Sequence, residues 1–260
     1  MPSPTDFNLS PYYDDFTESK KFHRILYRPG FAVQARELTQ SQSILQNQIE
    51  RSGDHFFKKG AMVIPGEIAF DVNYYAVKLS SIDSGVSLSS FSGIELTGGT
   101  SGLKGRVVNT VATDGTDPDT LYVKYIDSGT SNTETAFTDG ETLTGTATIS
   151  GVSTTINCVV STTATGSAAS IVAGVYYING FYVSVDDQTI ILDKYTNTPS
   201  YRIGVTITES YVTPNDDSSL NDNAAGSSNA NAPGAHRFKI DLTLLRKLLQ
   251  LLKIIILLSC

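Results

Sequence analysis

The sequence contains no tryptophan, only two cysteines and only three histidines in 260 residues. Cys158 and Cys260 are too few, and too far apart in the chain, to predict a disulfide framework. His23, His55 and His236 lack the paired spacing that a zinc site requires. We therefore expect neither a metal site nor a fold that depends on disulfides.

Positive charge is also in deficit. The 19 Lys and Arg residues are outnumbered by 26 Asp and Glu residues, and the formal net charge is −7. A protein that binds nucleic acid needs a basic face for the phosphates, so this balance argues against such a partner. The chain has no Gly-rich phosphate loop after a strand, no nucleophile elbow and no His-rich ligand set. We predict that the protein is not an enzyme and binds no cofactor.

Signals for export or for a membrane span are missing as well. The N-terminus, MPSPTDFNLSPYYDDF, has neither the basic nor the apolar region of a secretory signal. The other end, LRKLLQLLKIIILLSC, is apolar but contains charged and amide residues at four positions: Arg246, Lys247, Gln250 and Lys253. A membrane helix needs about twenty mostly apolar residues, so we expect no span.

Residues 244–260 form an atypical tail. Leu, Ile and Lys replace the Thr, Ser and Gly that dominate much of the preceding sequence. An amphipathic helix is one interpretation, and an end that is truncated or frame-shifted after about residue 245 is another. We favour the second, because the new composition continues none of the strand patterns before it.

One strong helical pattern is present in the first 240 residues, FAVQARELTQSQSILQNQIERSGDHFF (31–57). Mostly apolar or small residues recur in steps of four and three, at Phe31, Ala35, Leu38, Gln42, Leu45, Ile49, Ser52 and Phe56. Pro29 and Gly30 precede this amphipathic helix, and Gly53 is expected to end or kink it. Two interpretations stay open: a helix packed on its own domain, or a parallel dimeric or trimeric coiled coil in which Gln42 sets the register.

Residues 1–30 are rich in Pro, Tyr and Asp and predict an extended N-terminal arm. We expect Asp14, Asp15 and Glu18 to cap or dock this arm rather than to act as paired acids. Tyr and Arg are common at protein interfaces. The predicted subunit interface combines arm and helix residues: Tyr12, Tyr13, Arg28, Phe31, Leu38, Gln42, Leu45, Ile49 and Phe56.

After the helix, alternating patterns predict strands. A β-rich body is expected at 58–81 and 166–243, with a hairpin or two edge strands around Pro65-Gly66 and a hairpin at the Asn-Gly pair in YYINGFYVSV. Residues 82–165 predict an inserted small β-barrel or sandwich module, with strands at 105–111, 120–126, 141–146 and 154–160. SSIDSGVSLSSFSG and STTATGSAAS look like its linkers, and 213–235 is a polar loop. The expected fold is mainly β with one N-terminal α-helix.

Two acidic stretches, DGTDPD (114–119) and NDDSSLNDN (215–223), could suggest a cation site. Calcium needs six or more oxygens at fixed positions, as in an EF-hand loop. Neither stretch has that spacing, so we interpret both as solvated loops.

Three stretches of the chain resemble a known family. FNLSPYYDDFTESKKFHRILYRPGFAVQARELTQSQSILQNQIERSGDHFFKKGAMVIPG (7–66) is similar to the N-terminal portion of the DUF4815 kind of virion structural protein, found in cyanophages and other tailed phages. YYINGFYVSVDDQTIILDKYTNTPSYRIGVTITESYVTP and GSSNANAPGAHRFKIDLTL resemble later blocks of that family. The inserted segment, with LTGGTSGLKGRVV, is similar to small β-modules of phage structural proteins.

This resemblance implies a tail component in the virion, made in the host cytoplasm, and it supplies no catalytic residues. We expect a structural role in a baseplate, tail fibre or connector, with other tail proteins as partners and a homo-oligomer, trimer favoured. The alternative is a receptor-binding protein whose inserted module binds a host-surface glycan, although Trp, the usual stacking platform, is missing. A cell-wall-degrading tail enzyme is a third class, for which no acid pair or metal set stands out.

Overall fold

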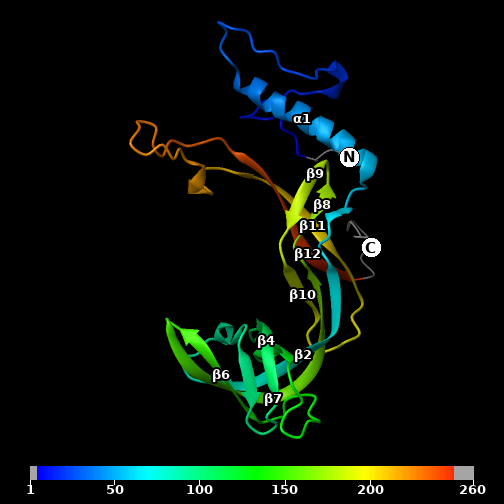
Figure 1. The fold of residues 1–260 in the computed structure, drawn as a ribbon, viewed down its shortest axis with the longest axis vertical. Helices are drawn as coiled ribbons and strands as arrows, with labels where there is room; N and C mark the ends of the chain where they lie inside the picture. The colour runs from blue at the N-terminus through cyan, green and yellow to red at the C-terminus, as the bar shows by residue number, and fades with distance from the viewer. Residues whose placement is uncertain (1–4, 249–260) are drawn as a thin grey trace. The chain divides into compact units, whose positions relative to one another are not determined.

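The computed structural model describes residues 5–248 and is mainly β, with one α-helix near the N-terminus (Figure 1). This confirms the predicted fold class. The helix is α1 (Ala35–Phe56), and short 3-10 turns lie at Glu18–Lys20, Leu88–Phe91 and Ser218–Leu220. The strands are β1 (Met62–Ile64), β2 (Ile68–Ile82), β3 (Glu95–Gly98), β4 (Lys104–Val111), β5 (Thr120–Tyr125), β6 (Thr142–Ile149), β7 (Val152–Ile171), β8 (Gly174–Ile178), β9 (Phe181–Val185), β10 (Gln188–Asp193), β11 (Tyr201–Val212) and β12 (Arg237–Leu248).

The chain divides into two compact units. Among the described residues, the helix unit contains 5–68, 171–188 and 203–248, and the module unit contains Ala69–Ser170 and Thr189–Arg202. The predicted insertion at 82–165 lies within the module unit, which extends farther at both ends and includes a later piece of chain. Most of the predicted tail, 249–260, lies outside the described residues; its first part continues strand β12 to Leu248.

The module unit is built on one sheet with the order β10-β7-β2-β5-β4-β3-β6. Strand β6 also pairs with β7, so the pairings run in a circuit from β7 through β2, β5, β4, β3 and β6 back to β7. All four strands predicted in this segment are present. Side chains from several strands of this sheet form its core, including Val77, Leu96, Leu121 and Leu143, and Phe91 joins them from the 3-10 turn at Leu88–Phe91.

A buried carboxylate fixes two loops of this unit. Glu141 is only 4% exposed, and its side chain accepts hydrogen bonds from the backbone N–H groups of Thr100, Ser101 and Thr138 and from the Ser101 hydroxyl, at 2.7 to 3.1 Å. Because each donor is satisfied by this one carboxylate, the turn after β3 and the turn before β6 are held together.

The second expected linker, STTATGSAAS, is not a linker. Residues 161–170 continue β7, which is 20 residues long. A Cβ added at Gly166 would lie 2.5 Å from the Lys194 carbonyl oxygen, and Ser167, Ala168 and Ala169 are buried. Small side chains are present here because another backbone approaches closely, which a composition-based interpretation cannot distinguish from flexibility.

The helix unit contains the sheet β1-β8-β9 and the two-stranded ribbon β11-β12. The predicted Asn-Gly hairpin is confirmed: β8 and β9 pair antiparallel across Asn179 and Gly180, whose φ values are +49° and +86°. Of the two alternatives at Pro65-Gly66, the hairpin is wrong, because β1 and β2 belong to different sheets. Strand β1 is an edge strand that pairs with β8, whereas β2 lies between β7 and β5 in the sheet of the module unit, so only one of the two expected edge strands is present.

Candidate functional site

Helix α1 begins four residues later than the sequence predicts. Phe31 lies in a turn, with its N–H bonded to the Arg28 carbonyl oxygen, and the helix starts at Ala35. The Glu37 carboxylate accepts the Gln34 backbone N–H at 2.9 Å, which satisfies a donor at the helix start. Phe31, the first residue of the predicted pattern, therefore lies before the helix, and its ring lies under the Arg28 guanidinium at 4.0 Å.

The arm runs back along one side of α1 (Figure 1). Asp14, which is buried, accepts a hydrogen bond from the Ser43 hydroxyl, and Asp15 accepts one from the Gln40 amide. Glu18 pairs with Arg51 near the other end of the helix. The prediction that these three acids dock the arm is confirmed. A hollow of about 540 Å³ remains between arm and helix, lined by residues that include Phe16, Phe22, His23, Ile44 and Arg51.

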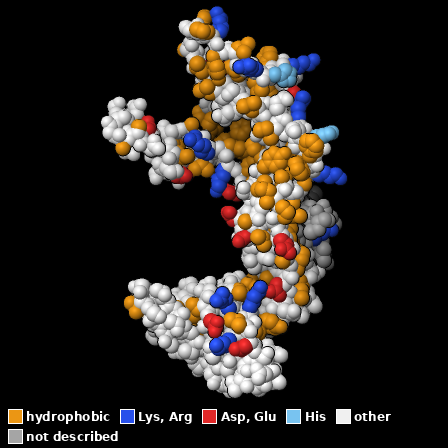
Figure 2. Space-filling view, viewed as in Figure 1, with side chains coloured by type: hydrophobic (Ala, Val, Ile, Leu, Met, Phe, Trp, Pro, Cys, Tyr) orange, Lys and Arg blue, Asp and Glu red, His pale blue; other side chains and the backbone are white. Residues whose placement is uncertain are grey.

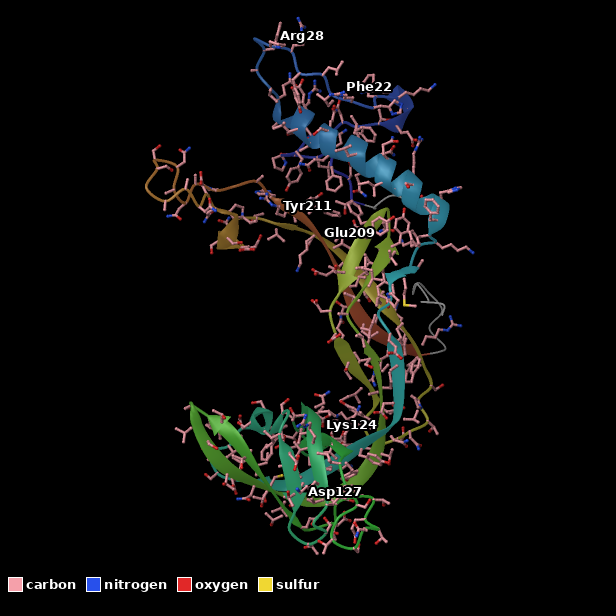
Figure 3. All side chains as sticks on the ribbon, viewed as in Figure 1. Phe22, Arg28, Lys124, Asp127, Glu209 and Tyr211 are labelled. Atoms are coloured by element: carbon pink, nitrogen blue, oxygen red, sulfur yellow. The ribbon has the colours of Figure 1, made fainter. Side chains whose placement is uncertain are left out.

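The start of the arm also contacts the β11-β12 ribbon. The Tyr12 ring stacks on Tyr211 at 5.2 Å, and its hydroxyl lies 2.8 Å from His236 Nδ1. Phe7 meets Phe238 edge to face, with 5.0 Å between ring centroids. Figure 3 shows Tyr211 beside Glu209 at this end of the ribbon. Tyr12, predicted as a subunit-interface residue, is thus partly used within the chain.

A second side of α1 rests on the β8-β9 hairpin. Gln46 donates its amide N–H to the Gly180 carbonyl oxygen at 2.7 Å. The Tyr177 hydroxyl lies 2.9 Å from the Glu50 carbonyl oxygen and 2.8 Å from Asp54 Oδ1. Burial raises the pKa of Tyr177, and the bond to Asp54 adds to this, so the hydroxyl stays protonated as a donor.

Gly53 allows the close approach of α1 to the β8-β9 hairpin. It does not end the helix, which continues for three residues to Phe56. An added Cβ at Gly53 would lie 2.4 Å from Tyr177 Cε2, and the Tyr177 ring is itself held by Phe57 and Tyr182. The glycine thus lets the helix backbone lie directly on the ring.

We expect Gly53→Ala to destabilise the helix unit by about 1–3 kcal/mol, because the methyl group has no space against the fixed ring. In an open helix the same change stabilises by roughly 0.5–1 kcal/mol, so the sign is diagnostic. Denaturant unfolding of the full chain measures it. Gln48→Ala, at an exposed α1 position on another side of the helix, is the control and should change stability by less than about 0.5 kcal/mol.

The third side of α1 faces outward. Leu38, Leu45, Ile49 and Phe56 are between 46% and 73% exposed, and Gln42 and Ser52, between them on this side, are also exposed. We call these six residues the outer stripe. In contrast, Ile44 on the arm side is 4% exposed. In Figure 2, hydrophobic side chains are prominent over the upper part of the view, where α1 and the arm lie. Two sides of the helix therefore pack within the helix unit. The outer stripe, which holds the predicted coiled-coil positions, is left uncovered within the single chain.

The structure brings only part of the predicted interface together. Five of the nine residues lie on one face of α1, Arg28 and Phe31 contact each other just before it, and Tyr12 and Tyr13 lie in the arm. Gln46, Gly53 and Tyr177, which orient this face, were missed by sequence reasoning. Gly53 offered a signal, since a glycine inside a helical pattern often marks a close contact.

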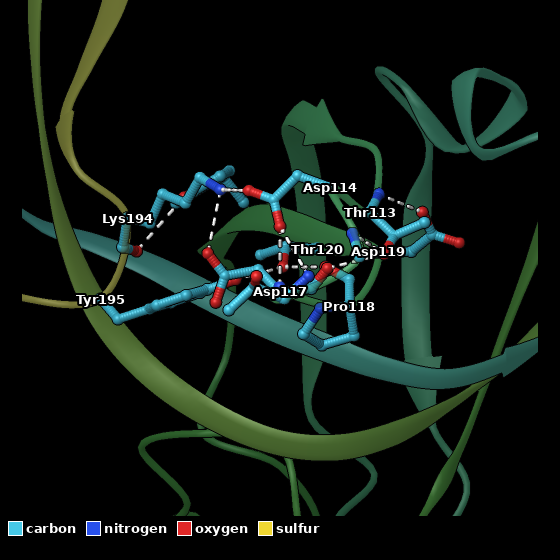
Figure 4. A network of polar contacts seen from close by, with 11 residues as sticks. Thr113, Asp114, Asp117, Pro118, Asp119, Thr120, Lys194 and Tyr195 are labelled. Carbon is cyan, nitrogen blue, oxygen red and sulfur yellow. Dashed lines mark hydrogen bonds and ion pairs between the residues drawn. The ribbon is translucent and has the colours of Figure 1, made fainter.

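The acidic stretch 114–119 is a braced loop in the module unit (Figure 4). The Lys194 ammonium lies 2.7 Å from Asp114 Oδ2 and 2.9 Å from Asp117 Oδ2. Backbone N–H of Asp117, the Lys194 ammonium and backbone N–H of Thr116 together lower the pKa of Asp114. Asp119 accepts the Thr113 N–H at 2.8 Å. These carboxylates are occupied by donors of the chain itself.

Metal-ligating side chains do not gather in the part of the chain that the structure describes. No three His, Cys, Asp or Glu residues within 5–248 are placed to hold a metal ion. Burial raises the pKa of the Cys158 thiol to about 12, which keeps it protonated and unreactive. The described residues also include no helix with the length and apolar character needed to cross a membrane.

A family model covers most of this architecture. The model named DUF4815, described as a domain of unknown function, matches residues 10–86 and 107–248. The chain belongs to the DUF4815 family. The match includes α1, the β8-β9 hairpin and the β11-β12 ribbon, and it omits only the 3-10 turn at Leu88–Phe91, β3 and the start of β4 from the intervening segment. No protein of curated function and no solved structure matches the chain.

Proposed function

We propose that this DUF4815 protein is a structural component of a phage tail, in a baseplate, tail fibre or connector, and that it acts by subunit assembly rather than by catalysis. The outer stripe of α1 carries this proposal. Four large apolar side chains share one exposed helix face, and an exposed apolar patch of this kind supports a role as a surface that other chains cover.

The spacing of the outer stripe suits copies of the same helix. Steps of four and three residues keep the seam facing a parallel partner, and Gln42 in the middle would fix the register. The N-terminal arm and the β8-β9 hairpin pack against the other two sides of α1, so the outer stripe is presented on a rigid support. A homotrimer is the favoured state, with other tail proteins bound around it in the virion after synthesis in the host cytoplasm.

Glycan binding by the inserted module is the second candidate. Aromatic side chains stack on sugar rings only when they are exposed. The aromatic residues within 82–165 are buried or half-buried, namely Phe91, Tyr122, Tyr125 and Phe137. This observation favours assembly over receptor binding.

Cryo-electron microscopy of the intact particle, with light scattering of the purified full chain, tests the proposal. We expect density for this fold in the tail, with α1 helices of several copies packed through their outer stripes, and a mass in solution near three chains. A monomer in solution with α1 facing solvent in the particle would contradict it. Retention on a glycan array would favour the receptor-binding alternative instead.

A further inference from the structure

A run of positive charge interrupts this otherwise acidic chain. Between Glu18 and Glu37 there is no acidic residue, and the basic residues Lys20, Lys21, Arg24, Arg28 and Arg36 are all exposed. We call residues 19–36 the basic segment. The whole chain has a formal net charge of −7, so without these five charges the remainder stands at −12. The basic segment is therefore electrostatically complementary to the rest of its own sequence.

The chain itself neutralises only part of this charge. Lys20 and Arg36 lie 3.8 and 3.6 Å from the carboxylate of Asp15, which they share. Lys21, Arg24 and Arg28 have no ion pair with any residue in the described range. Three positive charges are thus left on an extended stretch of backbone that belongs to neither a helix nor a strand.

Apolar side chains alternate with these charges. Phe22, Leu26, Tyr27, Phe31 and Val33 are all at least 49% exposed, and Leu26 reaches 77%. Figure 3 shows Phe22 and Arg28 on the arm above α1. Arg and aromatic residues together are typical of the buried centre of an interface, whereas a segment that only solubilises the protein needs no exposed aromatic groups.

We propose that the basic segment of one copy docks on an acidic surface of a second copy of this chain. This inference rests on the proposed self-assembly and names a contact in addition to the outer stripe. The segment leads directly into α1, so it lies next to the seam where a neighbouring copy would arrive. The inserted module is one acidic surface available in each copy. Residues 82–165 contain nine Asp and Glu against three Lys and Arg, and Asp83, Asp127 and Asp139 among them are exposed and have no ion pair with any described residue.

The first experiment reverses charge at two matched places. Arg24→Glu with Arg28→Glu changes the net charge by −4, and so does Arg202→Glu with Arg237→Glu, two exposed residues of β11 and β12 outside both the basic segment and the inserted module. In about 100 mM salt, sedimentation should show self-association at least roughly tenfold weaker for the first variant and within about twofold of wild type for the second. Salt near 1 M should remove most of the difference, because it screens exposed charges.

The second experiment maps the contact. A zero-length carbodiimide joins Lys amines to carboxylates in contact, and a mixture of isotope-labelled and unlabelled full chains distinguishes links between copies from links within one. We expect Lys20 or Lys21 of one copy joined to Asp or Glu of another. The Lys20–Asp15 pair within one chain serves as the internal positive control.

The outcomes separate this inference from the proposed function. Equal weakening by both double variants, or only intrachain links, would overturn the docking of the basic segment. If Leu38→Asp with Leu45→Asp, a double substitution in the outer stripe, dissociates the assembly while Arg24→Glu with Arg28→Glu does not, the proposed assembly stands and this contact fails. Loss of binding to phosphatidylglycerol vesicles or duplex DNA, with self-association unchanged, would overturn it in favour of a membrane or nucleic-acid partner.

Discussion

Replacing Leu38 and Leu45 together by Asp is expected to reduce the assembly to monomers while the chain stays folded. Both side chains lie on the outer stripe and are more than half exposed within a single chain, so the substitution leaves the intrachain core intact. In an assembled seam each leucine would contribute about 1.5–3 kcal/mol by burial. An unpaired carboxylate in its place costs several kcal/mol more.

Light scattering measures the mass, and circular dichroism with denaturant unfolding checks the fold. We expect the dissociation constant to rise by at least about a hundredfold, since about 2.7 kcal/mol already corresponds to that factor. The matched control is Gln48→Asp with His55→Asp, two exposed α1 residues with the same seven-residue spacing but outside the stripe. A folded Leu38→Asp/Leu45→Asp protein with an unchanged oligomer mass would remove the assembly role of the helix.

Glu141→Ala is expected to cause the largest loss of stability in the module unit. The substitution leaves the backbone N–H groups of Thr100, Ser101 and Thr138 and the Ser101 hydroxyl without their acceptor in a buried site. Each buried donor left without an acceptor costs about 1–3 kcal/mol, and hydrogen bonds to a charged group contribute more than neutral ones. We expect a loss of about 3 kcal/mol or more.

Denaturant unfolding gives the total effect, and hydrogen exchange should show faster exchange at 98–103 and 137–143 in particular. Glu141→Gln keeps one acceptor oxygen and should fall between wild type and Glu141→Ala. Asp139→Ala removes an exposed carboxylate from the same turn and is expected to change stability by less than about 0.5 kcal/mol. Equal effects of Asp139→Ala and Glu141→Ala would mean that the buried network does not hold the loops.

Local patterns predicted much of the fold. The Asn179-Gly180 turn was predictable because both residues tolerate the positive φ that a tight hairpin requires. Alternation of apolar residues predicted β4 to β7, since one face of each strand is buried in the module core. Errors arose where small residues have a packing role, as at Gly166 in β7, or where an expected hairpin partner belongs to another sheet, as for β1 and β2.

The sequence predicted which residues make up the outer stripe, but not how the helix and the arm are arranged around it. The sequence by itself determined that α1 carries a thin apolar stripe and that a basic, aromatic arm precedes it, because heptad spacing and charge are local properties. Only the tertiary structure decided which side of the helix stays uncovered. The contact of Gly53 with the Tyr177 ring holds one of the other two sides, and the hydrogen bond from Ser43 to Asp14 holds the second. Both contacts join residues that are distant in the chain, so the local sequence pattern does not predict them.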